Sequence, residues 1–193
     1  MPWTQKSAQR QKRTYQGQHR FEHWYRDNQV YFLTARCRGR FPAFAEEDAK
    51  HIFWDRFDHH TTEHGFTPWV TALLDNHYHT LGYLRVGAQL KPLMQRLHGS
   101  VAKLVNDTLP QRRTPFWKDT SDDAYMDGCL RSEQQGRATY RYVCRQSERH
   151  GACADWRGHP HTRVNIELES AIRRALELNA FLTGVRYKRY AER

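Results

Sequence analysis

The chain has 193 residues, a length that fits one domain, or one domain with appendages, and can bury a hydrophobic core without disulfide or metal staples. Its formal net charge of +10 favours a polyanionic partner, most simply nucleic acid, with a merely basic soluble protein as the alternative. The sequence has no apolar run of membrane-spanning length, no apolar signal segment after Met1 and no CxxC pair. We therefore expect a soluble, cytoplasmic and nucleoid-associated protein with reduced thiols and no membrane partner.

The chain begins with a basic segment that has no hydrophobic periodicity. Residues 1–20 carry five Lys or Arg side chains and no acidic one. This composition predicts a flexible basic arm that contacts phosphates, or equally a solvated tail. We expect a functional domain over 21–151 to follow, and then a C-terminal helix with a basic tail over 152–193.

A strand and a helix are predicted next. Residues 30–35 are rich in β-branched and aromatic side chains, which is typical of a strand. The acidic trio Glu46, Glu47 and Asp48 favours a helix N-terminus, because carboxylates there interact well with the helix dipole. Apolar residues at helical spacing continue from this trio toward Gly65, where we expect the helix to end.

Two strands and a second helix come after Gly65. The runs 66–74 and 77–84 are predicted to be strands that meet at an Asp-Asn turn. Over 88–106 the apolar residues follow the helical period closely, so a helix is expected there. Residues 107–120 contain two prolines and a basic pair, which indicate a loop.

The last third of the chain predicts two more helices. Ser132 and Gln135 fit a capping box that starts a helix running to about His150, with Gly151 as its C-terminal stop. A final helix is expected over 163–182. The order of strand, helix, two strands and further helices predicts an α+β fold, a split antiparallel sheet with helices packed on one face.

The turn between the two central strands carries the chemically most informative residues, Asp75-Asn76-His77-Tyr78-His79. His77 and His79 are two positions apart on a strand, so their imidazoles should point to the same face and suit one divalent metal ion. Asp75 shares their parity and is a possible extra ligand, provided that the turn keeps that parity. An incidental HxH is the alternative, since the chain has twelve histidines.

A tyrosine and a glutamine supply the second half of the expected site. Tyr142 and Gln146 are four residues apart on a predicted helix and share a face, whereas Tyr140 points away. A tyrosine hydroxyl, with its ordinary pKa of about 10, is a poor nucleophile unless a metal ion polarises the phosphate that it attacks. Imidazole and amide-oxygen ligands suit Mg²⁺ or Mn²⁺, with Zn²⁺ as an alternative. The combination indicates a metal-assisted tyrosine nucleophile acting on DNA.

These motifs resemble those of the single-tyrosine HUH transposases of insertion sequences, and most of all the REP-associated tyrosine transposases. The resemblance covers about residues 25–150 and is carried by the opening strand Tyr31–Thr34, the turn motif at 75–79, the helix residues 97–106, the segment 116–123 and the segment Arg141–Gln146. Gln146-Ser147 stands where REP-associated members often have Asn-Pro, and Leu74-Asp75 replaces the usual Met-Pro.

The resemblance implies a ferredoxin-like sheet of the HUH endonuclease type and a nuclease domain over 21–151. It also implies that Tyr142 attacks single-stranded DNA, keeps the 5′-phosphate as a phosphotyrosine and releases a 3′-OH. His77, His79 and Gln146 would bind the Mg²⁺ or Mn²⁺. The expected partner is single-stranded DNA with a hairpin, from a REP-like element or an insertion-sequence end, and a homodimer is a further expectation.

Additional DNA contacts are expected from basic and amide side chains on one helix, in the loop after it and near the two ends of the chain: Lys103, Asn106, Arg112, Arg113, Arg13, Lys188 and Arg189. A solvated helix face is the simpler reading of Lys103 and Asn106. Three other functions stay open, namely a domesticated hairpin-binding protein that does not cleave DNA, a phosphodiesterase that uses water, and a structural or RNA-binding basic protein.

Overall fold

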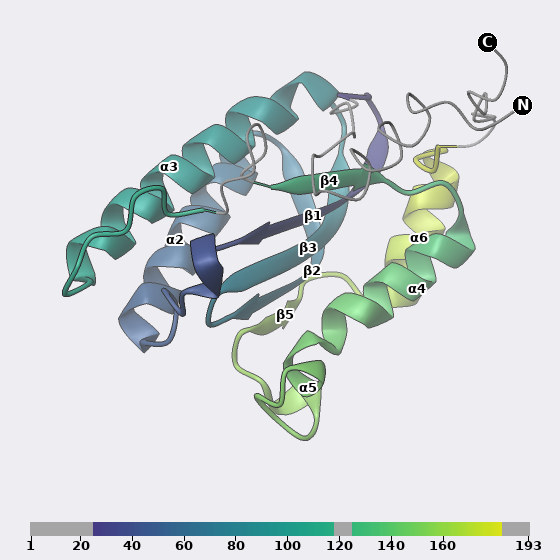
Figure 1. Ribbon diagram of the computed structural model, residues 1–193. Coiled ribbons are helices and arrows are strands. Elements are labelled where there is room, and N and C mark those ends of the chain that lie inside the picture. Colours follow the sequence, from purple (N-terminus) through teal and green to yellow (C-terminus); the bar gives the residue numbers. More distant parts are fainter. Residues whose placement is uncertain (1–24, 118–124, 183–193) are drawn as a thin grey trace, which may run out of the picture.

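The computed structural model describes residues 25–117 and 125–182, so the expected basic arm over 1–20 and the tail containing Lys188 and Arg189 lie outside the described residues. Five antiparallel strands form one sheet in the order β4-β1-β3-β2-β5 (Figure 1). The strands are β1 (Gln29–Arg36), β2 (Phe66–Leu74), β3 (His77–Leu84), β4 (Met126–Cys129) and β5 (Thr162–Val164).

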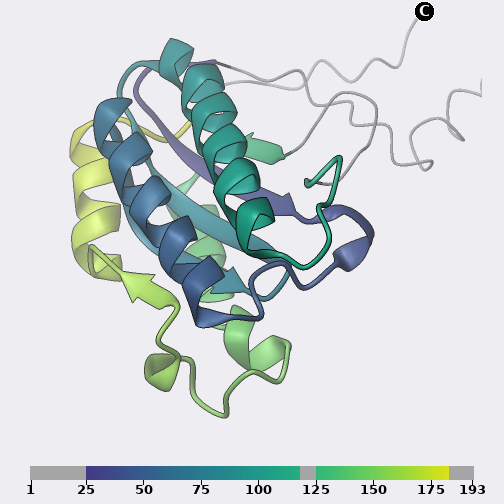
Figure 2. The same cartoon turned by 90° about the vertical axis from the view of Figure 1, so that its left-hand side faces the viewer.

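Helices cover both faces of this sheet. They are α2 (Glu47–Glu63), α3 (Leu90–Thr108), α4 (Glu133–Cys144), α5 (Gln146–Arg149) and α6 (Leu168–Glu177). One hydrophobic core joins the sheet to α2 and α3, and a second core joins the opposite face to α4 and α6 (Figures 1 and 2). Among the described residues, no helix is both long and apolar enough to cross a membrane.

The α+β class and the antiparallel sheet expected from the sequence are confirmed. The succession β1-α2-β2-β3-α3-β4 with the order β4-β1-β3-β2 is a ferredoxin-like arrangement, to which β5 adds a fifth strand beside β2. The expectation that helices pack on only one face is corrected. Because Val30 and Leu81 are as completely buried on one face as Tyr31 and Leu33 are on the other, both faces of the central strands need a cover.

The central strands and the first two helices lie where the sequence patterns predict them, but two short strands do not. No sequence pattern predicts β4, because Asp127 and Gly128 are poor strand formers. β5 straddles the expected start of the last helix at residue 163, whereas it is a strand that pairs with residues Val70–Ala72 of β2. That helix, α6, is accordingly shorter than the predicted span of 163–182.

The helix predicted from Ser132 to His150 is interrupted. Its N-terminus is as expected, since the Ser132 hydroxyl accepts a hydrogen bond from the main-chain N–H of Gln135. At Arg145 the backbone leaves the helical range, with φ −87° and ψ 12°, so α4 and α5 are separate segments. Gly151 ends α5 with a positive φ of 71°. The expected domain boundary at residue 151 lies between α5 and β5, and the residues on its two sides share the second core.

Candidate active site

The two histidines of the turn motif project from β3 toward the face covered by α4. His77 pairs with Arg36 of β1 and His79 pairs with Thr34, so all four side chains belong to the same face of the sheet. Tyr78, between the two histidines, points to the opposite core beneath α2 and α3. The HxH spacing therefore brings both imidazoles together, with ring centroids 5.1 Å apart.

A pocket of about 340 Å³ opens over these imidazoles. It is lined by side chains from β1, from the segment after it, from the β2–β3 turn, from β3 and from the α4–α5 region: Thr34, Arg36, Arg40, Asn76, His77, His79, Tyr142, Gln146 and His150. The structure thus brings Tyr142 and Gln146 to the two histidines across more than sixty residues of sequence.

Hydrogen bonds on the far side of each ring hold the histidines in place. The Nδ1 atom of His77 lies 2.7 Å from Asn76 Oδ1, and Asn76 Nδ2 donates to the carbonyl of Arg40. Because this amide oxygen can only accept, His77 Nδ1 carries the hydrogen and Nε2 keeps its lone pair. Thr34 Oγ1, 2.6 Å from His79 Nδ1, can hold His79 in the same tautomer. Such outer partners are typical of histidines that bind metal ions.

Burial also keeps these two imidazoles neutral. It lowers the pKa of His77 to about 4 and the pKa of His79 to about 3, with smaller contributions from neighbouring His150 and Arg36. A neutral imidazole is the form that can donate a lone pair to a metal ion. The donor set therefore fits a divalent cation at neutral pH.

Tyr142 stands at the mouth of the pocket with a 37% exposed side chain. Its ring meets the His79 ring edge-on at 5.4 Å, and the guanidinium of Arg149 lies 5.2 Å from its centroid. Tyr140 is buried instead and donates its hydroxyl hydrogen to the carbonyl of Ile166. Only Tyr142 of this pair is therefore accessible to a substrate.

Gln146 closes the pocket from the first turn of α5 and is only 1% exposed. Its Nε2 donates to the main-chain carbonyl of Tyr142, which leaves the amide oxygen as the atom for the pocket. The break at Arg145 lies between Tyr142 and Gln146. It allows one of them to face solvent while the other is enclosed.

Several pocket residues were missed by the sequence analysis. The His150 ring meets the His77 ring edge-on with centroids 4.8 Å apart, and its spacing of four from Gln146 is a signal that the sequence contained. Thr34 and Arg36 could be found only from the β1–β3 register. Arg40 lies in a short 3₁₀ turn that no pattern indicated.

Asp75, the possible extra metal ligand, does not line the pocket. It lies in the two-residue turn, where the alternation of a strand no longer applies, and its carboxylate lies 3.8 Å from Lys50 Nζ. The structure therefore brings together three of the four predicted ligands.

The predicted DNA contacts that fall within the described residues have different surroundings. Asn106 is buried and forms two hydrogen bonds with the main chain of Arg113. Its side chain accepts from the Arg113 N–H and donates to the Arg113 carbonyl. The guanidinium of Arg113 stacks on Phe41 at 4.1 Å. Lys103 is exposed and 3.4 Å from Asp107, and Arg112 is exposed. Asn106 is thus engaged within the protein, whereas the three basic side chains remain at the surface.

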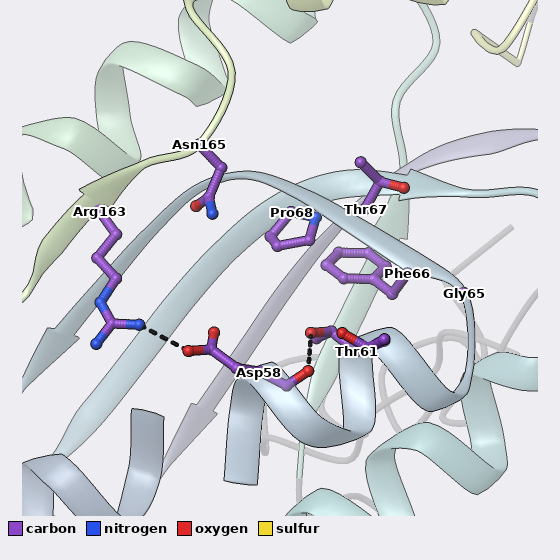
Figure 3. Close-up of a pocket in the computed structure, with 9 residues that line it drawn as sticks. Asp58, Thr61, Gly65, Phe66, Thr67, Pro68, Arg163 and Asn165 are labelled. Atoms are coloured by element: carbon purple, nitrogen blue, oxygen red, sulfur yellow. Dashed lines mark hydrogen bonds and ion pairs between the residues drawn. The ribbon is translucent and has the colours of Figure 1, made fainter. Parts of the chain in front are cut away.

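A larger pocket, of about 540 Å³, lies between α2 and the start of β2 (Figure 3). Three of its nine lining residues are threonines, and an ion pair between Arg163 and Asp58 spans it at 3.0 Å. It contains no imidazole and no tyrosine. The smaller pocket is consequently the candidate for catalysis.

Several solved structures resemble this chain, among them the following two. One, described as a REP-associated tyrosine transposase bound to a REP hairpin, aligns with 75% of this chain and 82% of its own at a TM-score of 0.62 and 13% identity. A candidate transposase from Deinococcus radiodurans R1 aligns with 58% of this chain and 87% of its own, but its TM-score of 0.43, at 14% identity, is too low to support an argument. No family model matches the chain, and no curated protein matches it in sequence.

The first likeness shows that the chain has the fold of a REP-associated tyrosine transposase. The fold therefore agrees with the family that the sequence motifs resemble. At 13% identity the comparison does not identify individual site residues, so their assignment depends on the geometry described above.

Proposed function

We propose that this protein is a metal-dependent endonuclease and strand-transferase for single-stranded DNA, with Tyr142 as the nucleophile. The observation that carries this proposal is the convergence of an accessible tyrosine, two neutral imidazoles and an amide in one pocket. His77, His79 and Gln146 would hold Mg²⁺ or Mn²⁺, and the bound ion supplies charge that stabilises the attacked phosphate.

In the proposed step, Tyr142 Oη attacks the scissile phosphorus and the bond from phosphorus to the 3′ oxygen breaks. The tyrosine loses its hydrogen and the departing oxygen gains one, so no net proton is consumed. The products are a 5′-phosphotyrosine and a free 3′-OH. Attack by the 3′-OH of another strand reverses the chemistry and transfers the strand. Arg36 and Arg40, which line the pocket, are suited to hold the flanking phosphates.

A hairpin is the proposed form of the DNA, from a REP-like element or an insertion-sequence end. The net charge of +10 favours a polyanion, and the structural neighbour is bound to a REP hairpin. That same likeness favours a second candidate function, a domesticated protein that binds hairpins without cutting them, because binding alone would explain it.

The test incubates labelled single-stranded hairpin DNA with the wild type, with Tyr142→Phe and with the matched control Tyr140→Phe, in Mn²⁺ or in EDTA. We expect a protein–DNA adduct on a denaturing gel for the wild type and for Tyr140→Phe in Mn²⁺, and none for Tyr142→Phe or in EDTA. The half-exposed Tyr142 should tolerate the change to Phe with a stability change of about 0.5 kcal/mol or less.

Each other result selects a different function. Hairpin binding by the wild type without an adduct in any divalent metal would favour the non-cleaving binder. Cleavage that persists in Tyr142→Phe would make water the nucleophile and would overturn the tyrosine mechanism.

A further inference from the structure

A second group of metal-ligating side chains lies at the C-terminal end of α2. His59, His60 and Glu63 belong to its last turn, and His64 caps it. His60 and His64 are four residues apart, so both can lie on one side of the helix end. None of these residues lines the pocket of His77 and His79.

Three imidazole nitrogens surround a single carboxylate oxygen there. Glu63 Oε2 lies 3.1 Å from Nδ1 of His60, 3.6 Å from Nε2 of His64 and 3.9 Å from Nε2 of His59. In a tetrahedral zinc site with bonds of about 2.0–2.1 Å, neighbouring ligand atoms are about 3.3–3.4 Å apart. These separations from Glu63 Oε2 are close to those that a shared ion requires, and ligand atoms from His59, His60 and Glu63, one from each, lie within 4.8 Å of one another. His64 adjoins this group through Glu63.

The far nitrogen of His60 is held by α3. His60 Nε2 lies 3.1 Å from Ser100 Oγ, and Ser100 donates its own hydroxyl hydrogen to the carbonyl of Leu97. Ser100 therefore accepts from His60, so that His60 Nδ1 carries a lone pair. This lone pair faces the carboxylate of Glu63, 3.1 Å away, an arrangement of two acceptors that a shared proton or a metal ion satisfies.

His64 presents a second nitrogen lone pair to the Glu63 carboxylate. Its Nδ1 lies 2.9 Å from Gln89 Oε1, an acceptor, which puts the hydrogen on Nδ1 and the lone pair on Nε2. The His64 side chain is 9% exposed, and its Nε2 is buried without a hydrogen-bond partner in the described ranges. A buried nitrogen without a partner is uncommon in folded proteins and suggests a missing ligand.

From this geometry we propose that His59, His60 and Glu63, with His64 as the fourth donor, form a second metal site that takes Zn²⁺ or a related transition-metal dication. Imidazole and carboxylate donors in a tetrahedral set suit Zn²⁺ better than Mg²⁺, which prefers six oxygen ligands. Ser100 and Gln89 act as the outer hydrogen-bond partners that orient the two buried imidazoles.

The exposure of the ligands gives the ion a way in. His59 and Glu63 are the exposed members of the group, whereas His60 and His64 form its buried wall. Positive charge from Arg56 and Arg96 also reaches this group, which favours modest rather than very tight binding. A bound ion would tie the end of α2 to the segment that enters α3, so it should raise the melting temperature.

The test uses the full chain without a histidine tag, in a His77→Ala/His79→Ala background that removes the catalytic pocket as a binding site. Co²⁺, whose visible absorption reports tetrahedral coordination, is titrated in and then displaced with Zn²⁺. We expect one equivalent to bind with tetrahedral bands. Adding His64→Ala, or the shape-conserving Glu63→Gln, should weaken binding at least tenfold and abolish the rise in melting temperature with Zn²⁺.

The matched control is His51→Ala, which removes an exposed histidine from the same helix outside the group. It should leave the stoichiometry, the bands and the melting shift unchanged. The proposal is overturned if the background protein binds no Co²⁺ or Zn²⁺. It is equally overturned if His64→Ala and Glu63→Gln bind as the background does, or if His51→Ala alone removes binding.

Discussion

At the scale of single residues, Asn76 has the most specific task in the candidate active site. Its amide bridges two parts of the chain, donating to the carbonyl of Arg40 and accepting from His77 Nδ1. Rotation of the amide would place an N–H group against His77 and require the other tautomer. The amide of Asn76 thus determines which ring nitrogen of His77 has a lone pair for a metal ion.

We expect Asn76→Ala to weaken Mn²⁺ binding by about 10–100-fold, because His77 would no longer be held in the liganding tautomer. The affinity can be measured from the electron paramagnetic resonance of free Mn²⁺ during titration. Asp75→Ala is the matched control from the same turn, since the Asp75 carboxylate faces Lys50, and it should bind Mn²⁺ as the wild type does. An equal loss in Asp75→Ala would mean that Asp75 is a ligand after all.

At the scale of elements, the helix that carries Tyr142 is held by its own chain. α4 packs on the sheet through Val143 and Tyr140, and against α6 at Gly136, where an added Cβ would lie 3.0 Å from Ile172. Arg137 adds a bidentate ion pair to Glu169 of α6. The last helix therefore supports the helix that carries the proposed nucleophile, and Tyr142 faces the histidines of the same polypeptide.

This arrangement predicts that two inactive variants cannot rescue each other. A mixture of Tyr142→Phe with His77→Ala/His79→Ala should form no DNA adduct, because neither chain has a complete site in cis. Co-expression followed by the denaturing-gel assay measures this, with wild type mixed with either variant as the positive control. Recovery of about a quarter of the wild-type adduct, the share of complete sites in randomly paired dimers, would instead reveal a homodimer that exchanges the helix.

The sequence predicted those elements whose patterns are local. The hairpin at 66–84 and the Ser132 cap depend on neighbouring residues, and each lies where it was expected. Tyr142 and Gln146 both line the pocket, but the break at Arg145 places them on two helices rather than on one. β4 and β5 were not predictable, because their stability comes from pairing with β1 and β2 rather than from their own composition. For the same reason Thr34 was missed, since only strand register places it beside His79.

At the scale of the whole molecule, each face of the sheet has its own core, and one of them contains a buried histidine. His98 of α3 lies with Tyr78 and Trp117, its Nε2 is 2.9 Å from Tyr78 Oη, and Trp117 donates to its carbonyl. Burial lowers the pKa of His98 to about 3. Protonation therefore favours the unfolded chain, whose histidines have a pKa near 6.5.

This predicts how stability depends on pH. The contribution of neutral His98 is complete above about pH 6.5 and is lost as the pH falls toward about 3, because only the unfolded state takes up the proton in that window. The limiting slope for one proton is about 1.4 kcal/mol per pH unit. Urea unfolding of the wild type and of His98→Gln between pH 7 and pH 4.5 measures it.

The wild type and His98→Gln share every other titrating group, so the difference between their free energies of unfolding isolates the contribution of His98. We expect the stability advantage of the wild type over His98→Gln to shrink steadily as the pH is lowered. Two curves that stay parallel over this range would show that His98 does not titrate on unfolding.

The strand order described above has a consequence for self-association. The two edge strands of the sheet are very short. β4 has four residues and β5 has three, whereas the inner strand β2 has nine. Long edge strands with unpaired backbone N–H and C=O groups pair with other chains and lead to aggregation. Within the described ranges, both edge strands of this sheet are short, so sheet-to-sheet polymerisation has little template to grow from, even though the neighbouring strands are rich in apolar residues.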